Sequence, residues 1–219
     1  MKIISDIRLY KSSDVDKYEE LTNKSLNIAV RRVVMKLREQ KFLLGEFDHL
    51  YVNFTVCIPE DKIELVDKID SYHPWYRYCN VGVNQHDYEK LNVDTDYVFE
   101  KLKLVLLNIF SKNENTDEII KTSFFEAQKG EKMLMLFKEK KTEKAKATIY
   151  LRLLDSGKYL PLLCVVDSDN NEILSEDLPE TIDLNSLGEI QLSGKKVTVK
   201  PRKNAFSKHL QPISFDIKL

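Results

Sequence analysis

Apolar and polar residues alternate in three stretches of the first half of the chain, and this period of two predicts β-strands. In residues 2–10 the alternation places Ile3, Ile7 and Leu9 on one face. Residues 49–59 alternate most regularly, with Leu50, Val52 and Phe54 on one face and Tyr51 and Asn53 on the other. A third strand is expected after Pro74, in residues 75–83.

Helical spacing predicts the elements between and after these strands. Within residues 14–40, Leu26, Val30, Val33 and Leu37 recur at the interval of an amphipathic helix. Ser13, with Asp16 three residues later, is a candidate N-cap, and residues 22–24 are a candidate break into two helices.

Two further helices are expected in residues 94–130. The first follows Asp94 and Asp96, whose carboxylates suit a helix N-terminus, and the second begins at Thr116 and ends before Gly130.

After Gly130 the pattern changes to short strand-like runs separated by turn sequences. The runs are residues 132–139, 146–154, 158–166, 189–192, 195–200 and 213–219. Such spacing is typical of an antiparallel meander or a small sandwich. We therefore expect an α+β fold in two parts. Residues 1–130 form an α+β domain with an N-terminal antiparallel sheet and packed helices, and residues 131–219 form a mainly antiparallel β domain.

The stretch 71–84, SYHPWYRYCNVGVN, gathers the only tryptophan and three of the ten tyrosines. Alternation predicts that Trp75 lies with Cys79, Val81 and Val83 on the core face of the strand. Tyr76 and Tyr78 then occupy the opposite face, and Tyr72 and His73 precede the strand in a loop. Because tyrosine and tryptophan often carry interface energy, the candidate partner-binding residues are Tyr72, His73, Tyr76 and Tyr78.

Composition restricts the class of protein. The net charge of −1 predicts no general attraction to nucleic acid or to an anionic membrane. The apolar start is interrupted by Ser5, Asp6 and Arg8, the apolar runs are too short to span a bilayer, and the three cysteines are widely spaced. These features predict a cytoplasmic protein with no membrane association.

One segment is locally basic. Residues 190–214 contain no acidic residue and carry Lys196, Lys200, Arg202 and Lys203, the alternative candidates for binding nucleic acid, with Phe206 available for stacking. The favoured interpretation is a solvated edge strand whose lysines oppose aggregation.

The sequence carries no recognisable catalytic or cofactor motif. Its six glycines are too far apart for a phosphate-binding loop, and its four histidines lack metal-ligand spacing. Residues 167–178 resemble a calcium loop but have Glu172 and Leu178 where glycine and glutamate are required, so a hairpin turn is favoured. A thiol–imidazole pair between Cys79 and His73 or His49 needs the tertiary structure to bring its members together. We expect no cofactor and no metal.

Residues 47–110 resemble small bacterial proteins of the toxin–immunity kind in the order FDHLYVNFTV, WYRYCNVGVN, YEKL and VFEKLKLVLLNIF. The resemblance implies a cytoplasmic, non-catalytic α+β protein that binds a cognate toxin domain, and it assigns no functional residue. The leading hypothesis is a non-enzymatic protein that binds another macromolecule. The alternatives are an enzyme whose site forms only in three dimensions and an RNA-binding protein that uses residues 195–208.

Overall fold

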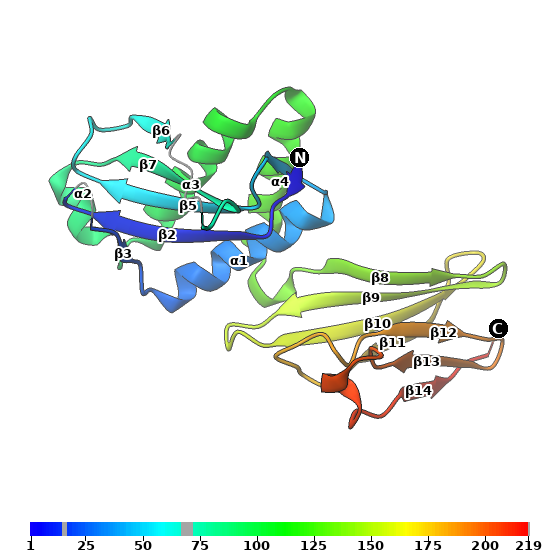
Figure 1. Cartoon of the computed structure of the whole chain (residues 1–219). Coiled ribbons are helices and arrows are strands. Elements are labelled where there is room, and N and C mark those ends of the chain that lie inside the picture. Colours follow the sequence, from blue (N-terminus) through cyan, green and yellow to red (C-terminus); the bar gives the residue numbers. More distant parts are fainter. Residues whose placement is uncertain (15–16, 67–71, 219) are drawn as a thin grey trace. The chain divides into compact units, whose positions relative to one another are not determined.

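The computed structural model describes residues 1–14, 17–66 and 72–218. The chain divides into two compact units, Met1–Lys129 and Gly130–Leu219. Figure 1 shows helices and a sheet in the first unit and strands in the second, which confirms the α+β class with a β-rich C-terminal part.

A five-stranded sheet in the order β3-β2-β5-β7-β6 is the scaffold of the N-terminal unit. Its strands are β2 (Asp6–Ser12), β3 (Glu19–Glu20), β5 (His49–Thr55), β6 (Ile63–Leu65) and β7 (Tyr76–Gly82). Two shorter strands, β1 (Lys2–Ile3) and β4 (Leu43–Gly45), pair separately.

The three central strands β2, β5 and β7 run parallel, whereas antiparallel pairing was expected for this sheet. Within this sheet, antiparallel pairing occurs only at the two edges, where β3 pairs with β2 and β6 pairs with β7. The helix between β2 and β5 accounts for the first parallel pair, because a crossover of this length returns the chain to the end of the sheet where β2 began.

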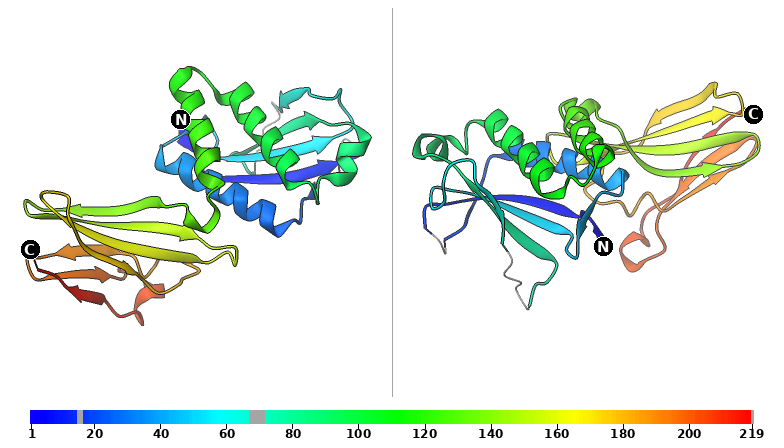
Figure 2. Two further views of the ribbon diagram at one scale, coloured as in Figure 1. Left: turned by 180° about the vertical axis from the view of Figure 1, so that it is seen from behind. Right: turned by 90° about the horizontal axis from the view of Figure 1, so that it is seen from above.

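Three long helices cover one face of this sheet, and in the views of Figure 2 the opposite face carries no helix. They are α1 (Lys24–Glu39), α3 (Thr95–Phe110) and α4 (Glu114–Ala127), and a short α2 (Gln85–Lys90) was not predicted. None of the helices in the described residues is both long and apolar enough to cross a membrane.

The helix starts follow from side-chain caps. Asp94, which was predicted to lie at a helix N-terminus, is the N-cap of α3, and Asn113 forms a capping box with Thr116 at the start of α4. The expected N-cap at Ser13 is wrong: α1 is capped by Asn23, whose side chain accepts a hydrogen bond from the Leu26 N–H. Asp16, the other half of that prediction, lies outside the described residues.

The core lies between the sheet and the helices. Leu26, Val30, Val33 and Leu37 are all buried, as the helical spacing predicted. Cys79, Val81 and Val83 also lie on the core side. Trp75 does not: it precedes β7 and is 39% exposed, so its assignment to the core is wrong. Alternation fixes a side chain's face only within a strand, and Trp75 lies just before the first strand residue.

The C-terminal unit contains two antiparallel sheets, in the orders β11-β10-β9-β8 and β12-β13-β14. The first is built from β8 (Met135–Lys141), β9 (Ala145–Leu153), β10 (Tyr159–Asp167) and β11 (Glu172–Asp177). The second is built from β12 (Glu189–Leu192), β13 (Lys196–Lys200) and β14 (Ile213–Asp216). Of these strands, β11 was not predicted.

The start of the segment that resembles a calcium loop forms the hairpin turn between β10 and β11, as favoured from the sequence. The Asp167 carboxylate accepts hydrogen bonds from the backbone N–H groups of Asp169 and Asn171, at 2.8 and 2.9 Å. This is an Asx-type turn, in which the aspartate oxygens satisfy the chain's own donors.

Candidate protein-binding surface

Strand alternation gives the N-terminal sheet two chemically different faces. The face under the helices carries Leu50, Val52 and Phe54 of β5, all with 0% exposure. On the opposite face, the parallel register places Arg8, Tyr51 and Tyr78 side by side, followed by a row of Tyr10, Asn53 and Asn80.

Aromatic rings on this opposite face pack against one another. Tyr51 stacks on Tyr76 with 4.6 Å between ring centroids, and Tyr18, from the segment before β3, stacks on Tyr78 at 4.4 Å. Tyr10 contacts the rings of both Tyr51 and Tyr78. Tyr51 is consequently the buried centre of the cluster, with 9% exposure, while Tyr76 and Tyr78 are half-buried.

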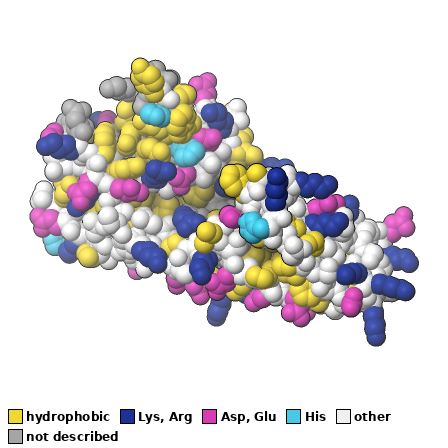
Figure 3. All heavy atoms as spheres, turned by 60° about the horizontal axis from the view of Figure 1, so that its bottom comes forward, with side chains coloured by type: hydrophobic (Ala, Val, Ile, Leu, Met, Phe, Trp, Pro, Cys, Tyr) yellow, Lys and Arg dark blue, Asp and Glu magenta, His cyan; other side chains and the backbone are white. Residues whose placement is uncertain are grey.

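The loop before β7 extends the cluster. The ring of His73 lies 6.2 Å from Tyr76 and 4.9 Å from Trp75. We define the aromatic face as Tyr10, Tyr18, Tyr51, His73, Trp75, Tyr76 and Tyr78. Figure 3 shows a broad hydrophobic patch, tyrosines included, with histidines on the N-terminal unit.

Of the four predicted partner-binding residues, the structure thus brings His73, Tyr76 and Tyr78 into one cluster. Tyr72 directly precedes His73 in the chain and is 86% exposed. The cluster also includes Tyr10, Tyr18, Tyr51 and Trp75, which were not among the candidates. Alternation along the predicted strands could have identified Tyr10 and Tyr51, but Tyr18 reaches Tyr78 only through a loop that has no periodic pattern.

Burial favours the neutral form of three hydroxyls of the aromatic face, those of Tyr10, Tyr51 and Tyr78. Burial, followed by the neighbouring tyrosines, raises the pKa of Tyr78 to about 12. Burial likewise raises the pKa values of Tyr10 and Tyr51. At neutral pH the face therefore presents uncharged rings with hydroxyls that can donate or accept hydrogen bonds.

Three basic side chains around the aromatic face lie beside carboxylates. Arg8 Nε lies 3.0 Å from Asp6, and Lys11 Nζ lies 3.5 Å from Glu19. His49 Nδ1 lies 2.7 Å from Asp48. With a carboxylate beside each of these basic groups, this surface lacks the positive field that nucleic-acid phosphates require.

The thiol–imidazole pair that the sequence left open does not form. Cys79 lies on the core face of β7, whereas His49 and His73 belong to the opposite side of the sheet. Burial also raises the pKa of the Cys79 thiol to about 12, so it is protonated at neutral pH. A protonated, buried thiol is a poor nucleophile.

The alternative nucleic-acid candidates are divided between a strand and a loop. Lys196 and Lys200 share the exposed face of β13, but they lie directly across from Asp216 and Glu189. Arg202 and Lys203 are exposed in the loop after β13, and Phe206 is exposed in the short 3-10 helix Ala205–Ser207 that follows. The cross-strand carboxylates offset the lysine charges, so the four residues do not form a continuous basic track.

The residues that the structure describes contain no group of three or more histidine, cysteine or carboxylate side chains arranged to hold a metal ion. Comparison with protein-family models, with curated proteins and with solved structures found no match.

Proposed function

We propose that this chain is a non-enzymatic binding protein that contacts a protein partner through the aromatic face. The observation that carries the proposal is a sheet face rich in half-exposed tyrosine, with tryptophan and histidine at its margin, which no helix of the described chain covers. Tyrosine and tryptophan are the side chains most often found at the energetic centre of protein interfaces.

The packing within the cluster supports a preformed surface. Tyr18, Tyr76 and Tyr78 already stack on neighbouring rings, so little side-chain freedom remains to be lost when a partner binds. Preorganised aromatic side chains give a large contact area at a low entropic cost.

The chemistry of the rim favours protein over nucleic acid as the partner. Bases can stack on tyrosines, but binding of single-stranded nucleic acid also depends on unpaired cations that follow the backbone. At this surface Arg8, Lys11 and His49 already have carboxylate partners. Within this proposal, the sequence resemblance favours a cognate toxin domain as the partner, which makes the chain an immunity protein acting in the cytoplasm.

The test uses a toxin domain encoded beside the gene, or a protein captured from the native host and then purified. Binding to the full chain is measured by calorimetry for the wild type, Tyr76→Ala, Tyr78→Ala and Trp75→Ala. We expect at least one variant to weaken binding by about 2 kcal/mol or more. Tyr150→Ala, which alters a half-buried strand tyrosine of the C-terminal unit, is the matched control and should bind as the wild type does.

If all three variants bind the partner as tightly as the wild type does, the aromatic face is not the interface. The affinity of the same proteins for single-stranded RNA, measured at physiological salt, tests whether the partner is a nucleic acid instead. RNA binding that is lost in the tyrosine variants would replace the protein partner with a nucleic acid.

A further inference from the structure

The two sheets of the C-terminal unit approach each other closely on one side. Lys138 of β8 donates from Nζ to the backbone carbonyl of Gly188, next to the start of β12. On the other side the sheets end at β11 and β14. In the described residues, β11 pairs only with β10 and β14 pairs only with β13.

The core between the sheets is incomplete along this second side. Val165 of β10 and Val197 of β13 point inward, with 0% exposure. Leu174 of β11 lies directly opposite Val165, and Phe215 of β14 lies opposite Val197, so each shares the inward face of its neighbour. Both edge residues are nevertheless only half-buried. Apolar side chains of both edge strands therefore remain partly open to solvent.

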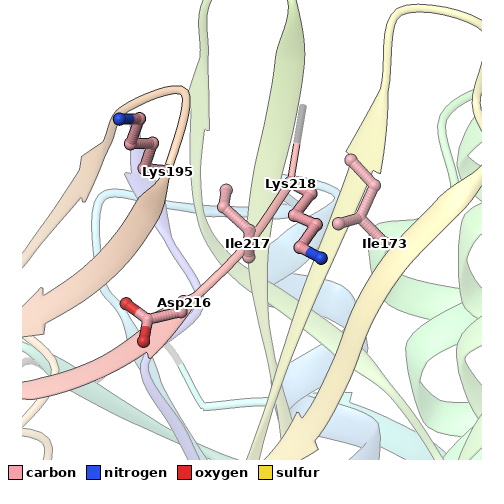
Figure 4. Close-up of a pocket in the computed structure, with 5 residues that line it drawn as sticks. All are labelled: Ile173, Lys195, Asp216, Ile217 and Lys218. Atoms are coloured by element: carbon pink, nitrogen blue, oxygen red, sulfur yellow. The ribbon is translucent and has the colours of Figure 1, made fainter.

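An open cavity of about 690 Å³ lies at this edge (Figure 4). Ile173 of β11 contributes from one sheet, and Ile217, directly after β14, contributes from the other. The remaining lining residues are Lys195, Asp216 and Lys218. The apolar lining therefore comes from Ile173 and Ile217, and the Lys218 side chain lies beside them in Figure 4.

The free edge of β14 also presents backbone hydrogen-bonding groups. The Ile217 N–H donates to the Lys195 carbonyl at 2.9 Å, so the odd-numbered residues of this segment direct their backbone groups toward β13. The backbone N–H and C=O of the even-numbered residues Ser214 and Asp216 then point away from β13. The close contact of the Thr198 and Ser214 hydroxyls, at 2.9 Å, fits this non-hydrogen-bonded pair.

We propose that the edge of β14 is a second protein-binding site, which takes an extended segment of a partner protein as an added strand. The segment hydrogen-bonds to Ser214 and Asp216, and its alternate apolar side chains enter the cavity between Ile173 and Ile217. This β-augmentation completes the core that the two sheets leave open.

Charge at the cavity specifies the segment further. Lys218 supplies a cation beside the apolar lining, whereas the Lys195 ammonium points away from Ile217, and Asp216 lies across the strand pair from Lys196. In Figure 4 the Lys218 side chain extends toward Ile173, and the Asp216 carboxylate points the other way. The segment that fits combines alternating apolar residues with an acidic side chain near Lys218.

The test is selection of a random peptide library against the full chain, followed by affinity measurements with the selected synthetic peptides. Ser214→Pro removes the outward N–H of β14, and it leaves the ladder to β13 intact because that donor does not face β13. We expect peptides with alternating apolar residues and an acidic group, and we expect Ser214→Pro to weaken their binding about tenfold or more. Ser214→Ala, which keeps the amide and removes only the hydroxyl, should bind as the wild type does.

A charge exchange tests the specificity. Lys218→Glu should weaken acidic peptides about tenfold, and replacing the acidic residue of the peptide by lysine should restore binding. The thermal midpoints of all variants establish that they are folded. Peptides that bind Ser214→Pro and the wild type equally, or a selection that yields no peptide, would overturn the proposal. Self-association of the wild type that Ser214→Pro abolishes would instead make a second copy of the chain the occupant.

Discussion

At the scale of single residues, burial separates the aromatic side chains that stabilise the fold from those available to a partner. Tyr51 and Trp75 illustrate the difference. Tyr51 packs against the rings of Tyr10, Tyr76 and Tyr78, whereas Trp75 packs against the ring of His73 and is 39% exposed. We therefore expect the larger side chain, Trp75, to contribute less to the stability of the fold than Tyr51 does.

Tyr51→Ala should destabilise the protein by about 3 kcal/mol or more, because it leaves a cavity under three rings. Trp75→Ala should cost about 1 kcal/mol, since much of its ring is already in water. Denaturant unfolding of both variants provides the measurement. A larger loss for Trp75→Ala than for Tyr51→Ala would contradict this assignment of the two aromatic residues.

The raised pKa of Tyr78 predicts a dependence of stability on alkaline pH. An unfolded tyrosine ionises near pH 10, whereas the folded Tyr78 ionises at about 12. The unfolded state therefore releases its proton first, so the stability that is fully present below pH 10 falls as the pH rises through 12. Tyrosinate absorbance and unfolding measured across this range should show the loss, and Tyr78→Phe should reduce its slope. An unchanged slope would mean that other groups cause the loss.

At the scale of elements, caps and close backbone contacts determine where helices begin and how loops pack. Asn23 both caps α1 and donates from its side chain to the Asn92 carbonyl at 2.8 Å. Gly188 lies against the backbone of the loop that follows β13, and its N–H donates to the Lys200 carbonyl.

Asn23→Ala should cost about 1 kcal/mol, because the cap and the bond to Asn92 are both lost. Ser13→Ala is the matched comparison: Ser13 is exposed and lies outside α1, so its replacement should change stability by less than about 0.5 kcal/mol. Chemical denaturation measures both. A comparable loss in the two variants would argue that the cap does not stabilise α1.

Gly188→Ala should be strongly destabilising, by about 2 kcal/mol or more. A Cβ at this position would lie 2.4 Å from backbone atoms of Pro201 and Arg202, which are not free to move as a flexible side chain would be. Gly194→Ala, where a Cβ meets nothing within 4 Å, should be neutral or slightly stabilising. Thermal unfolding of the two variants would reveal the contrast, and equal midpoints would disprove it.

At the scale of the whole molecule, the chain consists of two units, each with its own buried apolar residues. The charge-rich residues 139–146 are where the sequence suggests a protease would cut first. In the structure, most of them belong to the β8–β9 hairpin, whose strands pair along their length. A backbone that is hydrogen-bonded in a strand pair is poorly accessible to a protease, and only the short turn at residues 142–144 lies outside the paired strands in this segment.

Brief digestion with trypsin should therefore cut first near Lys129, at the junction of the two units, and leave a stable C-terminal fragment. Mass spectrometry of the early fragments identifies the site. Initial cleavage at Lys140, Lys141 or Lys144 would show that the hairpin opens more readily than the junction.

The periodic spacing of apolar residues along the sequence was enough to predict which side chains of individual helices and strands are buried. The spacing of Leu26, Val30, Val33 and Leu37 predicted the buried side of α1, and alternation separated Tyr76 and Tyr78 from Cys79 and Val81. These features were readable because helix and strand periods depend on residues that are close in the chain. Turn chemistry likewise favoured the hairpin at Asp167 over a calcium loop.

Only the tertiary structure decided which residues from distant segments meet. The parallel order of β2, β5 and β7, the stacking of Tyr18 on Tyr78 and the open edge at β14 all depend on strand pairing or loop closure across many residues. Such contacts cannot be read from the spacing of apolar residues, because the same alternation within each strand is compatible with several ways of pairing the strands. The sequence therefore identified His73, Tyr76 and Tyr78 of the aromatic face, because they lie close together in the chain. The other members, which include Tyr10, Tyr18 and Tyr51, were identified only from the tertiary structure, which brings distant segments together.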